Sequence, residues 1–147
     1  MSCFIQLNHY VIDGISVMPN PKYVESVAKR AGNVSAAIRI SPHKEDEKKY
    51  KLTLEIQVKP VPRKEKEFFP YMVAIGGTAF FTFENPCPRE EADKALRLNG
   101  ASILYGLLRA QVAQVTAQSV HGQFLLPTLN FVEMSKEVKG ISTLAKV

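Results

Sequence analysis

Cysteine is scarce in this chain of 147 residues, which contains only Cys3 and Cys87. The two form no C-x-x-C motif, and neither has a histidine near it in register. The sequence therefore predicts neither a zinc site nor a disulfide framework. Cysteines used this sparingly are typical of a reducing compartment, so we expect a cytoplasmic protein.

A long apolar run is also missing. The longest apolar-leaning stretch, residues 101–120, is interrupted by Arg109 and by three glutamines, which the core of a bilayer would penalise. Residues 1–8 contain neither a basic segment nor an uninterrupted apolar one, so we expect no signal peptide. These absences predict a soluble protein.

The motifs of nucleotide-driven and catalytic proteins are absent as well. The sequence has no P-loop motif and no GxGxxG fingerprint, so it offers no visible machinery for nucleotide-driven cycling. His9, His43 and His121 fall on different predicted elements, and no nucleophile stands beside a base. We expect no enzymatic activity, no cofactor and no metal.

The formal net charge of +5 raises nucleic acid or another acidic molecule as a partner. However, the densest basic clusters, at residues 44–51 and 63–66, are interleaved with aspartate and glutamate. Mixed-sign runs of this kind are typical of solvated loops. A basic nucleic-acid-binding module is therefore the alternative function from a different class.

Length and composition predict one packed domain. Apolar residues make up 46% of the chain and charged residues 22%, which is enough apolar surface for a core and too little charge for disorder. We place this domain at residues 1–139. The weakly patterned residues 140–147 are expected to form a mobile tail.

Alternating apolar side chains predict an antiparallel sheet of four strands in meander order. The predicted strands cover residues 4–10, continuing toward Gly14, and then 34–41, 50–61 and 68–84. The third strand is the clearest, because one of its faces carries Leu52, Leu54, Ile56 and Val58. In the last strand, the pair Gly76 and Gly77 indicates a bulge or a close approach of the backbone.

Helical spacing predicts one long helix and two short ones. The short helices are expected at residues 22–30 and at about 130–139. The long helix opens at Arg89, with carboxylates near its positive end, and runs to about His121, with Gly122 as its stop.

The long helix is too apolar to have half of its circumference in water. Arg109 is the only charged residue between Asn99 and Val120, and one sheet covers only one side of a helix. We therefore expect its other side to contact a second subunit, and we assign the apolar residues of the last strand to subunit contact or core. The predicted oligomer interface consists of Phe69, Tyr71, Val73, Ile75, Leu104, Leu108, Val112 and Val115.

The order of these parts and several local strings resemble the SecB family of protein-export chaperones. Residues 4–20 are similar to the family's first strand and the crossover loop after it, residues 50–59 to its next long strand, and residues 76–77 to its glycine pair. The most specific match is the ending formed by residues 122–124, 126–127 and 129–131. The resemblance spans roughly residues 4–135.

The resemblance implies an α+β fold, in which a four-stranded antiparallel sheet packs with a long helix and a short C-terminal helix, assembled as a homotetramer (a dimer of dimers). It also implies a function. Family members are ATP-independent holdases that keep unfolded client polypeptides, such as preproteins, in apolar grooves roofed by the crossover loop and the C-terminal helix. They deliver these clients to the translocation motor SecA.

We predict the groove from apolar residues in the crossover region and around the last helix. Met18, Tyr23, Phe124 and Leu126 are expected to be partly open in the empty protein, because they lie in proline-flanked irregular segments where full burial would leave backbone donors unpaired. For Leu129 and Phe131 a place in the core is an equally good interpretation. The predicted client-binding groove consists of Ile15, Val17, Met18, Tyr23, Val24, Phe124, Leu125, Leu126, Leu129 and Phe131.

One departure from the family concerns charge. SecB proteins are strongly acidic, and an acidic patch on their sheet helps to dock the basic zinc-binding tail of SecA. Here only Asp13 of that patch is retained, and Met18 and Met72 occupy the other corresponding positions. This difference argues against delivery to SecA. It favours, as the alternative within the family, a SecB-like chaperone that stabilises the antitoxin of a toxin–antitoxin system.

Overall fold

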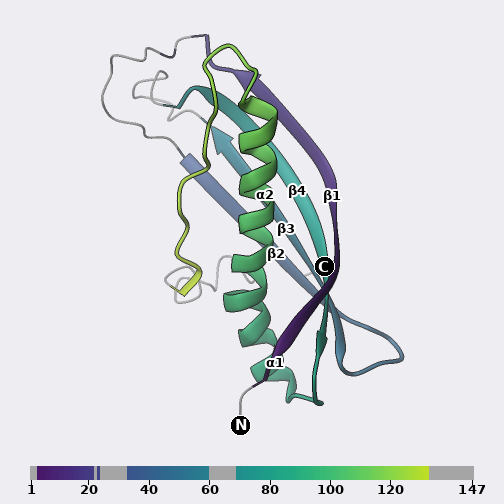
Figure 1. Ribbon diagram of the computed structural model, residues 1–147. Helices are drawn as coiled ribbons and strands as arrows, with labels where there is room; N and C mark the ends of the chain where they lie inside the picture. The colour runs from purple at the N-terminus through teal and green to yellow at the C-terminus, as the bar shows by residue number, and fades with distance from the viewer. Residues whose placement is uncertain (1–2, 22, 24–32, 60–68, 133–147) are drawn as a thin grey trace.

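The computed structural model describes residues 3–21, 23, 33–59 and 69–132. A four-stranded antiparallel sheet carries one long helix across one of its faces (Figure 1). The strands are β1 (Ile5–Pro19), β2 (Asn33–Pro42), β3 (Lys49–Lys59) and β4 (Tyr71–Phe83). The predicted α+β class, the antiparallel sheet and the long helix are confirmed.

The strand order is β1-β4-β3-β2, which corrects the predicted meander. Strands β2, β3 and β4 do follow one another as neighbours, but β1 pairs with β4 on the far edge. The sequence pattern shows which segments are extended and does not show which edge the first strand joins. As a result, β1 and β2 form the two edges of the sheet.

Strand β3 is the centre of the apolar face. Its even-numbered residues from Tyr50 to Val58 are buried and its odd-numbered ones point to the opposite face, as the alternation predicted. In β4 the odd-numbered residues from Tyr71 to Phe83 are buried on the same side. We call the side covered by the helix the inner face of the sheet and the opposite side the outer face.

Two irregularities in β1 change which side chains face the helix. The register with β4 shifts between Leu7 and His9 and again between Ile12 and Gly14. Because a one-residue insertion reverses the side to which later residues point, Tyr10 pairs opposite the buried Ala79 on the inner face. The second shift restores the alternation that a regular strand would have had.

The long helix consists of α1 (Arg89–Ala95), a π-helical turn η1 (Leu96–Gly100) and α2 (Ala101–Thr116). It ends five residues before the predicted end at His121 (121 − 116 = 5). The Thr116 hydroxyl accepts the Phe124 N–H at 2.9 Å, which turns the chain back along the helix. The turns that follow the helix end at Gly122, whose φ of +78° lies in the region that favours glycine.

The core lies between α2 and the inner face, and most of the predicted oligomer interface is part of it. Leu104, Leu108 and Val112 are fully buried against the sheet of their own chain. The core also contains the four residues that were assigned to subunit contact or core, which are Phe69, Tyr71, Val73 and Ile75. Of the predicted interface residues only Val115 remains exposed, at 40%.

Cys3 and Cys87 form a disulfide with a Cα–Cα distance of 6.1 Å, although the sequence predicted no disulfide framework. The reason is the register of the two strands. Ile5 pairs with Phe83 in antiparallel fashion, so the residues just before β1 lie beside those just after β4. A contact across 84 residues leaves no spacing motif in the sequence.

Several predictions fall outside the described residues. They include the helix at residues 22–30 except for Tyr23, which is described and not helical, and the groove residue Val24. They also include the tail at 140–147 and the last helix beyond Val132. No helix in the described part of the chain is both long enough and apolar enough to cross a membrane.

Candidate functional site

The end of β1 and the start of the C-terminal segment meet at one end of the molecule. Asn20 is buried there: its backbone N–H donates to Pro70 O at 2.7 Å, and its side chain donates to Phe69 O at 3.0 Å. The His121 ring lies 3.0 Å from Asn20 O and packs 5.0 Å from the Tyr23 ring. This junction joins two parts of the predicted groove, although neither asparagine nor histidine was predicted to belong to it.

Phe124 and Leu126 are not open, contrary to the prediction. Their exposed fractions are 1% and 0%, and Phe124 packs edge-on against Phe69 at a centroid distance of 5.6 Å. Phe131 is buried as well and packs against Tyr105. These three residues belong to the core of the protomer.

Side chains of the helix supply the hydrogen bonds that allow this irregular segment to be buried. Arg109 Nε donates to Leu126 O at 2.7 Å, and the Tyr105 hydroxyl donates to Pro127 O. Burial raises the pKa of Tyr105 to about 12, and the nearby Arg109 partly offsets this rise. Arg109, the only charged residue of α2, therefore donates to the C-terminal segment.

Leu125 and Leu129 remain accessible on the β2 side of the helix. The C-terminal segment runs beside α2 on this side (Figure 1), and Leu125 is 54% exposed between two buried neighbours. The inner face of β2 is buried at Ile38 and half-buried at Val34, Ala36 and Ile40. We group the accessible apolar residues of β2 and of the C-terminal segment as the β2 strip; it consists of Val34, Ala36, Ile40, Leu125 and Leu129.

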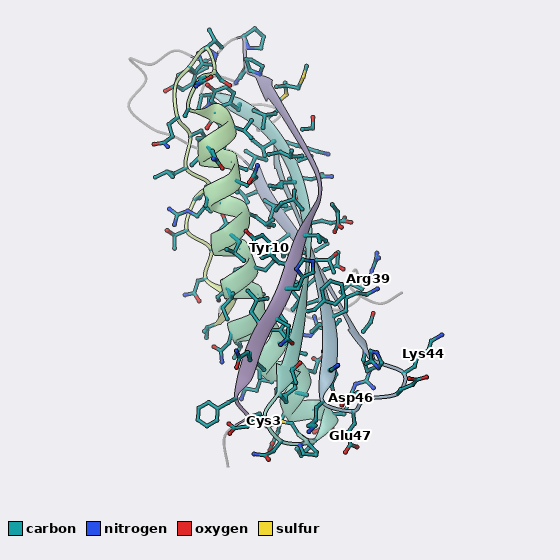
Figure 2. The ribbon with its side chains drawn as sticks, turned by 45° about the vertical axis from the view of Figure 1, so that its right-hand side comes forward. Cys3, Tyr10, Arg39, Lys44, Asp46 and Glu47 are labelled. Carbon is teal, nitrogen blue, oxygen red and sulfur yellow. A yellow bond between two sulfur atoms is a disulfide. The ribbon has the colours of Figure 1, made fainter. Side chains whose placement is uncertain are left out.

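A second apolar surface follows the opposite edge of the inner face. Ile15 is 37% exposed and Val17 is half-buried there. Figure 2 shows Tyr10 on β1 beside the helix. We call this surface the β1 strip; it consists of Tyr10, Ile12, Ile15 and Val17. Met18 is exposed on the outer face, where it pairs with Met72, so it does not belong to the strip.

The side of α2 that faces away from the sheet is uncharged. Ile103 is exposed on it and Leu107 is half-buried. Two small exposed residues, Gly106 and Ala110, flank Leu107 along the helix. We call this surface the outer helix face; it consists of Ile103, Gly106, Leu107, Ala110 and Gln114.

A hollow of about 1050 Å³ lies elsewhere, beside the hairpin that joins β2 and β3. Its walls contain Lys44, Lys49 and Lys51, and within the described ranges none of these lysines pairs with a carboxylate. Figure 2 shows Lys44 in the hairpin together with Asp46 and Glu47. No residue of the predicted groove lines this hollow. Its walls also contain the aromatic residues Tyr50, Phe80 and Phe81.

One long helix lies on one face of the sheet, and apolar residues remain accessible near both edges of that face. The chain belongs to the SecB family, described as preprotein translocase subunit SecB, which matches residues 4–139. This is a family of chaperones. No curated protein matches the sequence.

The fold is similar to that of the SecB-like chaperone of Mycobacterium tuberculosis, solved in complex with a ChAD peptide from the HigA1 antitoxin. The two are 11% identical, with a TM-score of 0.66 over 86% of this chain and 91% of the other. A protein of unknown function from Streptococcus agalactiae is also 11% identical, with a TM-score of 0.49 over 87% of this chain and 100% of that one.

Proposed function

We propose that this protein is an ATP-independent holdase that binds non-native polypeptides along the β2 strip. The observation that carries the proposal is an open apolar surface beside an unpaired strand edge. Leu125 is exposed between two core residues, and β2 has a partner on only one side among the described strands. An extended client at this edge gains main-chain hydrogen bonds from β2 and apolar contacts from the strip.

The strip suits release without nucleotide. Full burial of a leucine or valine side chain contributes about 1.5–3 kcal/mol, but the residues of the strip are already partly buried in the empty protein. Each one therefore adds only a part of that free energy when a client covers it. A client held by several such contacts dissociates by mass action once its own folding or another partner competes.

We further propose that copies of the chain associate through the β1 strip and the outer helix face. Strand β1 is 15 residues long, and Asp13 is its only formally charged residue. Edge strands are usually protected from pairing with other chains by charges, by proline or by being short. Strand β1 is long and nearly uncharged, so we expect another chain to pack against it. The outer helix face is uncharged as well, and its small residues permit close packing of a second helix. Two such surfaces on one chain fit a homotetramer built as a dimer of dimers.

Within the family, the chemistry of the outer face supports an antitoxin as the client more than delivery of preproteins to SecA. Asp13 Oδ2 accepts a hydrogen bond from the Thr78 hydroxyl at 2.6 Å, so this carboxylate is already engaged. Met18 and Met72 pair on the same face. Among the described residues of that face, a basic tail finds no cluster of free carboxylates. The related chaperone solved with an antitoxin peptide supports this choice of client.

The variant Leu125→Ser tests the binding surface. About half of this side chain is free to be covered by a client, which corresponds to about 1 kcal/mol, or about fivefold in affinity for an unfolded polypeptide. Its urea midpoint should change little, because the side chain is exposed at 54%.

Phe80→Ser is the matched control. Phe80 is also an exposed apolar residue, at 38%, but it lies on the outer face, so its loss should leave client binding unchanged. Unaltered binding by Leu125→Ser, or equal losses in both variants, would contradict the assignment of the β2 strip.

A further inference from the structure

The disulfide lies beside a carboxylate at the end of the sheet where α1 begins. Cys3 precedes β1, Cys87 precedes α1, and Glu91 is in the first turn of α1. Figure 2 shows Cys3 at this end of the molecule. The two sulfur atoms and a carboxylate oxygen of Glu91 all lie within 4.8 Å of one another, and Cys3 Sγ is 3.7 Å from Glu91 Oε2.

We propose that Cys3, Cys87 and Glu91 form a zinc site when the disulfide is reduced. Two thiolates and a carboxylate are ligands that zinc accepts, and three protein ligands leave one position for water. Both cysteines are half-buried and Glu91 is exposed, so an ion can reach them from solvent. This site is separate from the β2 strip and does not depend on the proposed holdase function.

The geometry already fits one edge of a zinc tetrahedron. With a Zn–S bond of about 2.3 Å and a Zn–O bond of about 2.1 Å, a tetrahedral angle places sulfur and oxygen about 3.6 Å apart. The observed distance between Cys3 Sγ and Glu91 Oε2 is 3.7 Å. Two sulfurs on the same ion lie about 3.8 Å apart, a separation that side-chain rotation provides once the S–S bond is cut. The backbone has no need to move, because the two Cα atoms are already 6.1 Å apart.

The disulfide and the metal exclude each other. A dithiol reductant supplies two electrons and two protons to the S–S bond, becomes a disulfide itself, and leaves Cys3 and Cys87 as thiols. Zinc then binds both sulfurs as thiolates and releases the two thiol protons. Re-oxidation by hydrogen peroxide takes two electrons from the thiolates and two protons from solvent, re-forms the S–S bond, releases Zn²⁺ and yields two molecules of water.

The test is a titration of the untagged full-length chain with Co²⁺, a spectroscopic substitute for zinc, in oxidised and in reduced form without oxygen. The reduced protein should bind one ion per chain and develop the near-ultraviolet charge-transfer absorption of thiolate–cobalt bonds, which excess zinc then removes. The oxidised protein should show no such absorption. Cys3→Ser or Cys87→Ser should reduce it, and the double variant should abolish it.

Glu91→Gln separates the third ligand from the cysteines. It should weaken binding at least about tenfold, the lower end of the loss seen when a metal site loses a supporting partner. Glu90→Gln is the matched control, because Glu90 is exposed in the same turn and lies outside the cluster. A reduced wild type without the absorption would overturn the site. Equal Co²⁺ affinities of Glu91→Gln and Glu90→Gln would show that Glu91 is not a ligand of the site.

Discussion

The contact between α2 and β4 at Gly77 leaves no room for a side chain. A Cβ atom at this position would lie 2.8 Å from Leu108 Cδ2 and 3.2 Å from Val11 O. Leu108 is fully buried, so its methyl group has no free space to enter, and Val11 O belongs to the paired backbone of β1. We expect Gly77→Ala to lower the free energy of unfolding by about 1–3 kcal/mol, the usual cost of overpacking a core.

The neighbouring glycine supplies the control. A Cβ atom on Gly76 would meet only Glu55 Cγ at 3.5 Å and Leu54 O at 3.8 Å, which are ordinary contacts on the outer face. Gly76→Ala should therefore leave the stability unchanged or raise it by about 0.4–1 kcal/mol, because alanine restricts the unfolded chain. Urea denaturation of both variants measures the difference. Equal midpoints for Gly76→Ala and Gly77→Ala would refute the close approach of α2 to β4.

Three further predictions concern the C-terminal segment and its anchors. Phe124→Ala should cost about 3–5 kcal/mol in urea unfolding, because the side chain is buried against Phe69 and Tyr71; a loss of client binding at unchanged stability would return Phe124 to an open groove. Thr116→Val should cost about 1–3 kcal/mol, because the Phe124 N–H loses its acceptor, and Thr116→Ser, which keeps the hydroxyl, should cost less. Folding raises the pKa of Tyr105 from 10.0 to about 12. Between these two values the folded protein keeps the Tyr105 proton and the unfolded chain loses it. Stability should therefore fall as the pH rises through this window, and Tyr105→Phe should remove that part of the fall.

The strands and the long helix were predictable because their signals are local. The alternation of apolar residues from Leu52 to Val58 predicts a strand with one buried face, and these residues are buried on one face of β3. The two register shifts in β1 carry no comparable signal. An inserted residue such as Asn8 looks like any other strand residue, yet it decides that Tyr10 faces the helix.

Burial of the C-terminal segment was mispredicted for a physical reason. An irregular backbone was expected to stay near water because it has no secondary structure to pair its polar groups. In the structure Thr116, Arg109 and Tyr105 pair with those groups from the helix. Such bonds join residues that are distant in sequence and follow no spacing rule. The same limit applies to the disulfide, which depends on the pairing of β1 with β4.

The residues of the long helix that were predicted as an oligomer interface lie mostly in the core of their own chain. Apolar spacing identifies a stripe on a helix and does not tell which part of a wide stripe the sheet covers. Leu108 and Val112 proved to face the sheet, whereas Ile103 and Ala110 face away from it. The low charge of α2 is the signal behind the proposed association of copies of the chain.

The central claim, that this chain holds non-native polypeptides on apolar surfaces, is tested most directly by one binding measurement. The untagged protein is titrated, without nucleotide, against a labelled, permanently unfolded polypeptide at low and at high salt, with labelled single-stranded RNA in parallel. We predict saturable binding of the polypeptide with an affinity that changes little with salt, because burial of apolar surface is not screened by ions. Binding of RNA alone, with an affinity that falls steeply as salt is added, would contradict the account and favour a basic nucleic-acid-binding module.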